Sequence, residues 1–509
     1  MAKSKIKIIK EKDYKIEFVD RILDPVHGFI DLTQVEKELI ELPIFKRLQS
    51  LKQLSLANWV FPGAEHTRYM HSLGVMYIAD LMALNLKDEN YSPVFNDGQR
   101  QLLRLAGLLH DIGHYPLSHV TEYVYNDNLF EESDSIFAYN QKIKKSIDNL
   151  VSTGLGSSDY MKSRYTKPWH HETMGSFVIE KDDNIKQIIE KYCPFIDIED
   201  IKDIIVGCVE RNPKISAMVQ LIHSELDADG IDYVMRDATF SGTSYGGFEL
   251  GLLLRNLVVR KYKDIDIVGI RPKGISVVDQ YLISKYFSYT QVIFNKHVAI
   301  YGQMAEMLTK HLVKLDKSTY PGRNTLRDHI KMHSNNDEYL RFTDRAFWSQ
   351  IDNLKESDLQ GYVPEYIVLT HKRLSHYQEF ETVNGGEVVI TSNNRSKVYE
   401  TLTNSPVYTH LSDKDESKLI LFHHKAFTSE IPESEFRNIL FSLGSKKDEH
   451  IDEEAFEKRF TIKNIARLQE GIPVIGKGSN LKLLVDDTRS VMSHLYDTQT
   501  YILREYIIN

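Results

Sequence analysis

Apolar side chains recur at helical spacing through much of the chain. Residues 72–86 and 98–110 each return one apolar stripe to a single face, and helical patterns also run over about 171–236 and 279–315. Apolar positions three or four residues apart indicate amphipathic helices with one buried face. The stripes consist of Leu73, Met76, Ala79, Met82, Ala83 and Leu86 in the first helix and Leu102, Leu105, Ala106, Leu108 and Leu109 in the second. The pattern therefore predicts a mainly helical body.

Helix starts are marked in the segment before these stripes. Thr33 and Glu36 have the spacing of a capping box, in which two side chains bind backbone amides at a helix N-terminus. Pro43 suits the first turn of a second helix, because that position needs no amide hydrogen. We therefore expect a helix, a break at Pro43 and a second helix over 43–56. Residues 5–19 partly alternate between apolar and charged positions, which predicts a short strand pair.

Strand and turn signals appear later in the chain. Residues 257–278 predict a short hairpin, and VNGGEVVIT at 383–391 predicts another, since Asn-Gly tolerates the positive φ of a tight turn. The glycine- and serine-containing stretch 150–169 indicates an inserted loop. Beyond about residue 360 the pattern mixes strands and helices.

These signals predict three regions. We expect an N-terminal extension at 1–20, a mostly helical domain at 21–330, and a smaller α+β region at 331–509 with an oligomerisation or regulatory role.

Composition narrows the class of protein. The 509 residues are 42% hydrophobic and 27% charged, which is typical of a folded globular chain. The net charge of −9 disfavours nucleic acid or an anionic membrane as the default partner, although a local basic groove stays open. No apolar stretch of the length of a membrane span is present, and the two cysteines, Cys193 and Cys208, lie outside any CxxC pattern. We expect a cytoplasmic protein.

Candidate chemistry is concentrated in three segments, HTRYMHSLG (66–74), LLHDIGHYPLSH (108–119) and HSELDADGIDYVMRD (223–237). Imidazole nitrogens and carboxylate oxygens are ligands for divalent metals. Adjacent helical residues such as His110 and Asp111 point about 100° apart. At a helix end, however, the backbone can turn both inward, and we expect Gly113 to make that turn easy.

No single motif here is specific. A His-Asp pair occurs about once by chance in a chain of this composition. His71 taken by itself is best interpreted as a core histidine. The combination carries more weight: one histidine opens a helix, a His-Asp pair closes another, and a later acidic helix has one buried side.

In order, spacing and flanking residues, the three segments together resemble the HD-domain metal-dependent phosphohydrolases, and more narrowly the deoxynucleoside triphosphate triphosphohydrolases. The similarity covers about residues 21–310, from RILDPVHGFIDL to QVIFNKH. It implies a mainly α fold, an HD-domain helical bundle with short hairpins, followed by a smaller α+β C-terminal region.

The resemblance also implies a metal site. His71, His110, Asp111 and Asp229 fall on the four ligand positions of the family, with Asp227 and Asp232 as alternatives for the last one. The implied cofactor is a divalent ion: Mn, Mg, Fe or Zn.

Catalytic and substrate residues follow from the same resemblance. His114 and His171 fall on catalytic histidines, and Glu122 falls on their acidic partner. The implied substrate contacts are Gln53, Arg68, Tyr233, Asp237, Lys285 and Lys296. We expect His119 to have a packing role or to support a neighbour, and His170 to lie at the surface.

Three positions depart from the family pattern. Lys285 stands where many relatives have arginine, Asn295 stands where relatives have histidine, and Gly230 replaces a lysine of the mammalian member. We therefore expect the phosphate charge to be met differently, or substrate choice to be looser.

The implied activity is hydrolysis of deoxynucleoside triphosphates to deoxynucleoside and tripolyphosphate, in which metal-activated water attacks the α-phosphate. The expected assembly is a homo-oligomer, with nucleotides as candidate activators. The alternatives are an HD phosphohydrolase acting on a cyclic nucleotide, an alarmone or nucleic acid, and a nucleotide-binding scaffold with little turnover.

Overall fold

The computed structural model describes most of the chain. The described residues are 10–126, 136–150, 169–262, 265–316, 320–332, 337–354, 382–414, 418–430, 432–434, 453–478 and 480–507.

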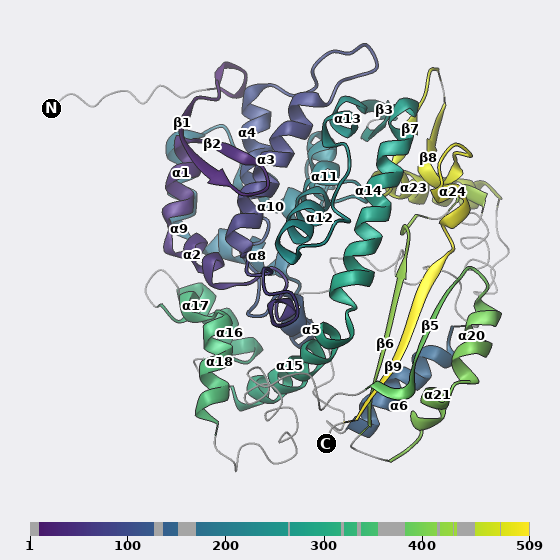
Figure 1. The fold of residues 1–509 in the computed structure, drawn as a ribbon. Coiled ribbons are helices and arrows are strands. Elements are labelled where there is room, and N and C mark those ends of the chain that lie inside the picture. Colours follow the sequence, from purple (N-terminus) through teal and green to yellow (C-terminus); the bar gives the residue numbers. More distant parts are fainter. Residues whose placement is uncertain are drawn as a thin grey trace.

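A helical body forms the larger part of the molecule (Figure 1). Two antiparallel strands, β1 (Phe18–Asp24) and β2 (Gly28–Thr33), lead into it. Its helices are α1 (Gln34–Glu41), α2 (Pro43–Lys46), α3 (Arg68–Asn85), α4 (Asp97–Leu109), α5 (His119–Asn126), α8 (His171–Lys181), α9 (Asp183–Tyr192), α10 (Ile198–Val206), α11 (Ser216–Ile222), α12 (Ala228–Ser241), α13 (Leu250–Arg255), α14 (Ile275–Phe287) and α15 (Lys296–Leu315). Short 3-10 turns lie at Glu11–Asp13, Arg47–Ser50, Ala57–Trp59, Pro213–Ile215 and Pro272–Gly274.

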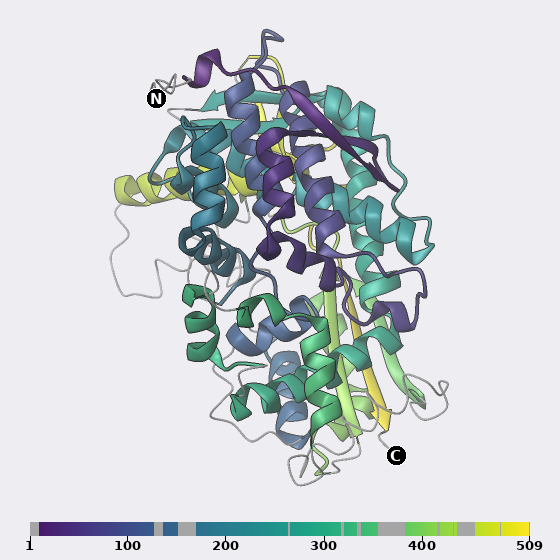
Figure 2. The ribbon, with the colours of Figure 1, turned by 90° about the vertical axis from the view of Figure 1, so that its left-hand side faces the viewer.

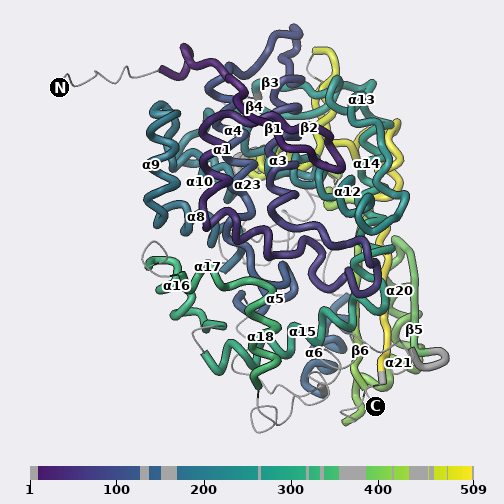
Figure 3. Tube along the Cα trace, turned by 60° about the vertical axis from the view of Figure 1, so that its left-hand side comes forward, coloured from purple at the N-terminus to yellow at the C-terminus, as the bar shows by residue number. Residues whose placement is uncertain are grey.

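Three further helices, α16 (Arg323–Met332), α17 (Glu338–Arg341) and α18 (Asp344–Asn353), lie together at one end of the body (Figure 3). The buried guanidinium of Arg47 joins them to the body, because it donates to the carbonyls of Phe342, Ile112 and His114.

Two more sheets are built from strands distant in sequence. A four-stranded sheet has the order β3 (Leu257–Tyr262), β4 (Ile265–Ile270), β7 (Pro473–Ile475) and β8 (Leu481–Leu483). An antiparallel three-stranded sheet has the order β5 (Thr382–Ser392), β9 (Gln499–Ile507) and β6 (Lys418–Ala426). Figures 1 and 2 show the second sheet as three long strands at one end of the molecule. The remaining elements are α20 (Arg395–Thr403), α21 (Pro406–His410), α23 (Glu453–Glu470), a 3-10 turn at Leu484–Asp486 and α24 (Met492–Leu495).

Elements of the C-terminal region pair and pack with elements of the helical body. β7 pairs with β4 of the body in parallel. Conversely, a helix from earlier in the chain, α6 (Ile136–Asp148), packs on the three-stranded C-terminal sheet. Its Ile147 joins a small apolar core with Val398, Leu402 and Leu503. The domain boundary near residue 330 stays a prediction.

Several sequence-based expectations are confirmed. The fold is mainly α with small sheets. The capping box of Thr33 and Glu36 starts α1, Pro43 opens α2, and α4 covers 97–109. The expected hairpin at 257–278 is β3–β4. Among the described residues, no helix is both long enough and apolar enough to cross a membrane.

The predicted strand pair at 5–19 is wrong for the described part of that segment, where residues 14–17 are not strands. The hairpin lies at 18–33 instead. Its turn decides the position: the Asp24 carboxylate accepts hydrogen bonds from the amides of Val26 and His27, and Gly28 adopts a φ of +71°.

The expected helix over 43–56 ends early. α2 stops at Lys46, and a 3-10 turn follows to Ser50. The backbone then pairs with the segment before α3: Arg68 donates its amide to Leu51, and Gln53 donates its amide to His66. This long-range pairing replaces further helix and brings Gln53 beside Arg68.

The predicted hairpin at 383–391 is also wrong. β5 is one strand, whose pairing with β9 shifts register between Thr382 and Glu387. The Asn-Gly pair lies inside that irregularity, because β9 provides a continuous partner on which the extra residues form a bulge. Residues 151–168 of the expected loop lie outside the described residues. The helical pattern at 279–315 is two helices, α14 and α15, separated by a π-helical turn at Ser288–Ile293.

Candidate active site

Three helices bring the expected metal ligands to one point. His71 lies in the first turn of α3, His110 and Asp111 follow the end of α4, and Asp229 lies in the first turn of α12. Nε2 of His71 is 2.9 Å from Oδ1 of Asp229 and 3.8 Å from Oδ2 of Asp111. Nε2 of His110 is 3.5 Å from Oδ1 of Asp111 and 3.9 Å from Oδ1 of Asp229.

This donor set fits a divalent cation. Ligand atoms of His71, His110 and Asp111 all lie within 4.8 Å of one another. Nε2 of each imidazole is buried and makes no hydrogen bond within the described part of the chain. A buried polar atom without a partner is costly, and a metal ion would satisfy both nitrogens at once.

Of the three candidate aspartates, Asp229 has the best position for the fourth ligand. The Asp227 carboxylate caps α12, where it accepts hydrogen bonds from the amides of Gly230 and Ser224 at 2.7 and 3.2 Å. The Asp232 carboxylate lies on the far side of His71 and bonds its Nδ1 at 2.7 Å. Only Asp229 approaches the Nε2 side of both histidines, which supports its assignment as a ligand.

Asp232 is held in a buried network behind the metal site. Nε2 of His27 lies 2.6 Å from one oxygen, and the Arg236 guanidinium donates to both oxygens. Arg236 also binds Asp24, at the turn of the β1–β2 hairpin. The sequence analysis weighed Asp232 only as a ligand. Its contacts instead make it the group that fixes the ring of His71.

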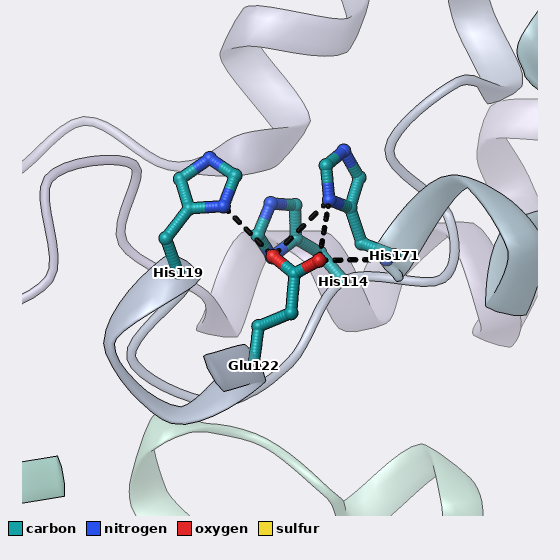
Figure 4. Close-up of side chains that lie close together, drawn as sticks. All are labelled: His114, His119, Glu122 and His171. Carbon is teal, nitrogen blue, oxygen red and sulfur yellow. Dashed lines mark hydrogen bonds and ion pairs between the residues drawn. The ribbon is translucent and has the colours of Figure 1, made fainter. Parts of the chain in front are cut away.

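A second cluster of side chains lies next to the ligands (Figure 4). The Glu122 carboxylate contacts Nδ1 of His171 at 3.2 Å and Nδ1 of His119 at 2.8 Å, and it accepts the backbone amide of His171 at 3.0 Å. The ring of His114 stacks on that of His171, with 4.3 Å between centroids. Nε2 of His171 and of His114 lie 3.8 and 3.9 Å from Oδ1 of Asp111.

Of the two roles expected for His119, the structure fits the support of a neighbour. Its side chain is 54% exposed, so it is no packing residue, and its contact with Glu122 makes it part of the cluster. Its only sequence signal is its position in the HDIGHYPLSH segment. His170 is half-buried, and Nε2 lies 3.5 Å from Glu122.

Neighbouring charges shift the pKa values of His71 and Asp111 in the metal site. Burial by itself lowers the pKa of His71, but the adjacent carboxylates of Asp229 and Asp232 outweigh it and raise the pKa to about 10. Burial raises the pKa of Asp111, yet Arg68 and the neighbouring histidines hold it well below its usual range. The protein therefore keeps Asp111 ionised, as a metal ligand must be.

The two stacked histidines differ in charge state. Burial lowers the pKa of His171, but the Glu122 carboxylate raises it to about 9. Burial, together with the charges of Arg68 and His171, lowers the pKa of His114 well below its ordinary value. One ring is therefore cationic at neutral pH and the other is neutral, which lets the pair hold and exchange protons.

Arg68 faces the site from the first turn of α3. Its guanidinium donates to Oδ2 of Asp111 at 2.8 Å and to the hydroxyl of Ser118 at 3.0 Å. Ser118 also donates to the carbonyl of Lys52, and the Asp344 carboxylate accepts the amides of Lys52 and Leu117. Asp344 thus fixes two loops of the site from α18, a role that its sequence context did not reveal.

The other expected substrate residues differ in burial and in their contacts. Gln53 is buried, and its side-chain oxygen has no hydrogen-bond partner among the described residues. Asp237 pairs with His66 at 2.9 Å. Lys296 lies exposed at the start of α15, where its carbonyl accepts the Tyr506 hydroxyl.

Tyr233 and Lys285 lie on the side of the site that faces α14. Burial raises the pKa of Tyr233 well above its usual range, and the carboxylates of Asp229 and Asp227 add to the effect. The Lys285 ammonium contacts the Glu225 carbonyl at 3.4 Å and its carboxylate at 3.6 Å.

Two glycines are required by close approach. A Cβ on Gly230 would lie 2.2 Å from the hydroxyl of Tyr281 and 2.8 Å from Oδ1 of Asp227, so no lysine fits at this position without movement of these side chains. A Cβ on Gly113 would lie 2.1 Å from the amide nitrogen of Gly175 in α8. We expected Gly113 to ease the turn after His110, but positive φ occurs in that loop at Leu117 and Ser118 instead.

The segment that carries His71, His110 and Asp111 matches a known family. Residues 68–154 match the HD domain family. The uncharacterized protein YwfO of Bacillus subtilis is 28% identical over 351 residues, which are 65% of this chain and 66% of that protein. A homolog of MG461 from Mycoplasma pneumoniae, also uncharacterized, is 30% identical over 53% of this chain and 55% of its own length. The chain thus spans just under two thirds of the first of these curated relatives and about half of the second.

Two further comparisons concern the fold and the HD segment. A crystal structure of a hypothetical protein from Aquifex aeolicus has a TM-score of 0.61 with 22% identity and covers 96% of each chain, which shows a shared fold. Deoxynucleoside triphosphate triphosphohydrolase SAMHD1 of Gallus gallus is 44% identical over 99 residues, which are 19% of this chain and 16% of that protein. In residues 68–154 the chain is therefore similar to the HD domain family, and it resembles the deoxynucleoside triphosphate triphosphohydrolases among the HD-domain metal-dependent phosphohydrolases.

Proposed function

We propose that this protein hydrolyses deoxynucleoside triphosphates to deoxynucleoside and tripolyphosphate with the help of a divalent cation. The observation that carries the proposal is the convergence of the free Nε2 atoms of His71 and His110 with Asp111 and Asp229, directly beside the Glu122–His171 pair. The similarity of the HD segment to SAMHD1 supports the choice of substrate.

His71, His110, Asp111 and Asp229 would hold the cation. When bound, it would lower the pKa of coordinated water and polarise a phosphoryl oxygen. Mn, Mg, Fe and Zn are all compatible with two imidazoles and two carboxylates.

The neighbouring side chains handle protons and phosphate charge. Glu122 accepts a hydrogen bond from Nδ1 of His171, so Nε2 of that ring is aimed at the ligand site and serves as the proton donor to the leaving 5′ oxygen. His114 stacks on it and donates at Nε2, because its Nδ1 accepts the Tyr115 amide. Arg68 binds a phosphate oxygen beside Asp111, where its planar guanidinium can form two parallel hydrogen bonds.

Further side chains would contact the sugar and the phosphates. Gln53, Tyr233 and Asp237 would line the deoxyribose, where a close fit would exclude a 2′ hydroxyl. Lys285 and Lys296 would add positive charge.

The test is direct product analysis. Purified protein is incubated with each of the four deoxynucleoside triphosphates and with GTP, singly and mixed, in Mn²⁺ or Mg²⁺, and products are separated by ion-exchange chromatography. We expect deoxynucleoside and tripolyphosphate in equimolar amounts. A dependence on mixing would support nucleotide activators, and light scattering of the same samples tests the expected homo-oligomer.

Other outcomes would support one of the alternative functions. Suppose that the protein hydrolyses a cyclic nucleotide or an alarmone and none of the four deoxynucleoside triphosphates. The protein would then still be a phosphohydrolase, but the proposed substrate would be wrong. If metal is bound and no nucleotide or nucleic acid is cleaved, the protein is a nucleotide-binding scaffold.

A further inference from the structure

The three-stranded C-terminal sheet is docked on the helices that follow the metal site. Phe427, just after β6, stacks on Tyr286 of α14 with 4.0 Å between ring centroids. His423 of β6 stacks on Phe294 at 4.9 Å. The hydroxyl of Ser429 donates to the Glu225 carboxylate. These contacts hold the end of β6 against the active-site half of the body.

This docking brings two lysines to one carboxylate. Lys285 contacts Glu225, whereas Lys425 of β6 has no ion pair or hydrogen bond within the described residues. Its ammonium lies over the ring of Tyr289, 3.9 Å from the centroid. Burial and the charge of Lys285 lower the pKa of Lys425 to about 8. Both ammonium groups therefore feel the Glu225 carboxylate, but among the described residues only that of Lys285 lies within ion-pair distance of it. Asp227 also acts on Lys285, so Lys425 is the less neutralised of the two lysines.

The two lysines lie on the side of the metal site formed by α14. The Tyr281 hydroxyl touches α12 beside Gly230, the residue after the ligand Asp229, and the Lys285 ammonium lies 5.9 Å from the ring of Tyr281. The Tyr281 hydroxyl is buried without a hydrogen-bond partner among the described residues. Tyr289, the ring under Lys425, follows Lys285 by four residues.

We propose that Lys425 binds the terminal phosphates of the nucleoside triphosphate, so that the C-terminal sheet completes the active site. This inference rests on the proposed function. An α-phosphate at the metal would leave the β- and γ-phosphates to extend toward neighbouring cations. A half-buried ammonium held beside a second one is stabilised when a polyanion binds between them. The aromatic ring of Tyr289 holds the ammonium in place without neutralising it.

Three variants of the full-length protein test this inference. Lys425→Gln removes the charge at similar length, Lys425→Arg retains it, and Lys477→Gln is the matched control, because Lys477 is an exposed lysine after β7. Thermal unfolding and metal content establish that each variant is folded and loaded. Binding of inorganic tripolyphosphate and of inorganic phosphate is measured by calorimetry at two salt concentrations, and KM and kcat are measured for the substrate found above.

We expect Lys425→Gln to weaken tripolyphosphate binding and raise KM by about ten- to a hundredfold, the usual effect of losing one charge-assisted contact. Binding of inorganic phosphate and kcat should change much less, and the salt dependence of tripolyphosphate binding should fall. Lys425→Arg should recover most of the affinity, and Lys477→Gln should match wild type.

Equal tripolyphosphate affinity and KM in Lys425→Gln and wild type would overturn the inference and leave the proposed function intact. If the wild type cleaves no deoxynucleoside triphosphate, the proposed function fails, and the tripolyphosphate titration still decides the role of Lys425. A loss of kcat alone would assign Lys425 a structural role and also overturn the inference.

Discussion

Four of the five histidines in the two clusters have one nitrogen bound to a protein partner and the other turned toward the site. Nδ1 is bound in all four, to Asp232 in His71, to the Gly107 carbonyl in His110, to the Tyr115 amide in His114 and to Glu122 in His171. A bound Nδ1 fixes both the tautomer and the ring plane, so Nε2 is presented in a defined direction. The site is therefore preorganised before any ligand arrives.

The first prediction separates metal binding from proton transfer. His110→Ala and Asp111→Ala should abolish both metal retention and turnover, because each removes a ligand. His114→Ala should retain metal and lose rate by about 10²–10⁴-fold, the usual contribution of a general acid or base. Metal content by mass spectrometry and initial rates check this. Full activity of His114→Ala would contradict its assigned role.

The second prediction concerns the residue behind the ligand. Asp232→Asn weakens the hold on Nδ1 of His71, and we expect metal affinity to fall by about 10–100-fold. Asp227→Asn is the matched control, since asparagine still caps α12 and this carboxylate faces backbone amides. Metal titration and thermal unfolding of both variants are the measurements. Equal metal affinity of the two variants would show that Asp232 does not support metal binding.

The third prediction is a pH dependence of stability at Lys425. Its pKa falls from the ordinary 10.5 to about 8 because of burial and Lys285, with Glu225 opposing the shift. Between these values the unfolded chain binds more protons than the folded one, so stability rises with pH there and is lost as pH falls toward 8. Lys425→Gln should therefore stabilise the protein by about 1–3 kcal/mol at pH 7.

Urea denaturation of both proteins at pH 7 and pH 10 measures this difference. The gain should shrink at pH 10, where the lysine of the folded wild-type protein is already neutral. A variant that is less stable than wild type at pH 7 would show that Lys425 acts as a structural contact.

At the scale of elements, the site depends on how closely α8 approaches the loop after α4. Gly113 and Gly175 face each other at this crossing, and His171 enters the site because the two backbones are nearly in contact. Two glycines permit an approach that side chains would prevent. The distance between the metal ligands and the Glu122–His171 pair is therefore set by packing.

The fourth prediction compares these two glycines. A Cβ on Gly113 meets backbone atoms of α8 at 2.1 and 2.4 Å, so Gly113→Ala must displace α8 and should cost about 1–3 kcal/mol or more. A Cβ on Gly175 has its nearest contact at 3.3 Å, so Gly175→Ala should be tolerated far better. Chemical denaturation and kcat are measured for both. A larger effect at Gly175 would contradict the packing described here.

A cation in the metal site would stabilise the whole molecule. Two helix starts and one helix end meet there, so a bound cation would link α3, α4 and α12. A ligand that binds only the folded state adds free energy that grows with its concentration.

The fifth prediction is that removing the metal lowers the melting temperature. At metal concentrations of about 100–1,000 times Kd, chelation should cost about 3–4 kcal/mol. Thermal unfolding with and without EDTA measures the shift, and Asp111→Ala, which lacks a ligand, is the control that should not respond. An equal response of that variant would place the stabilising metal elsewhere.

The amino-acid sequence by itself determined the local features. The apolar stripes of α3 and α4, the capping box at Thr33 and the start at Pro43 depend on residues three or four apart, whose contacts form within a single turn. Motif order also indicated the HD domain before any contact was visible, and the four expected ligands do meet in space.

Only the tertiary structure decided the parts that depend on distant segments. Pairing of residues 51–53 with 66–68 shortened an expected helix, and β9 turned an expected hairpin into one bulged strand. Asp344 and Lys425 each contact partners more than a hundred residues away in the sequence, in positions that no periodicity marks. Local spacing governs which elements form, whereas the choice between alternatives of similar local energy falls to contacts that exist only after the chain has folded.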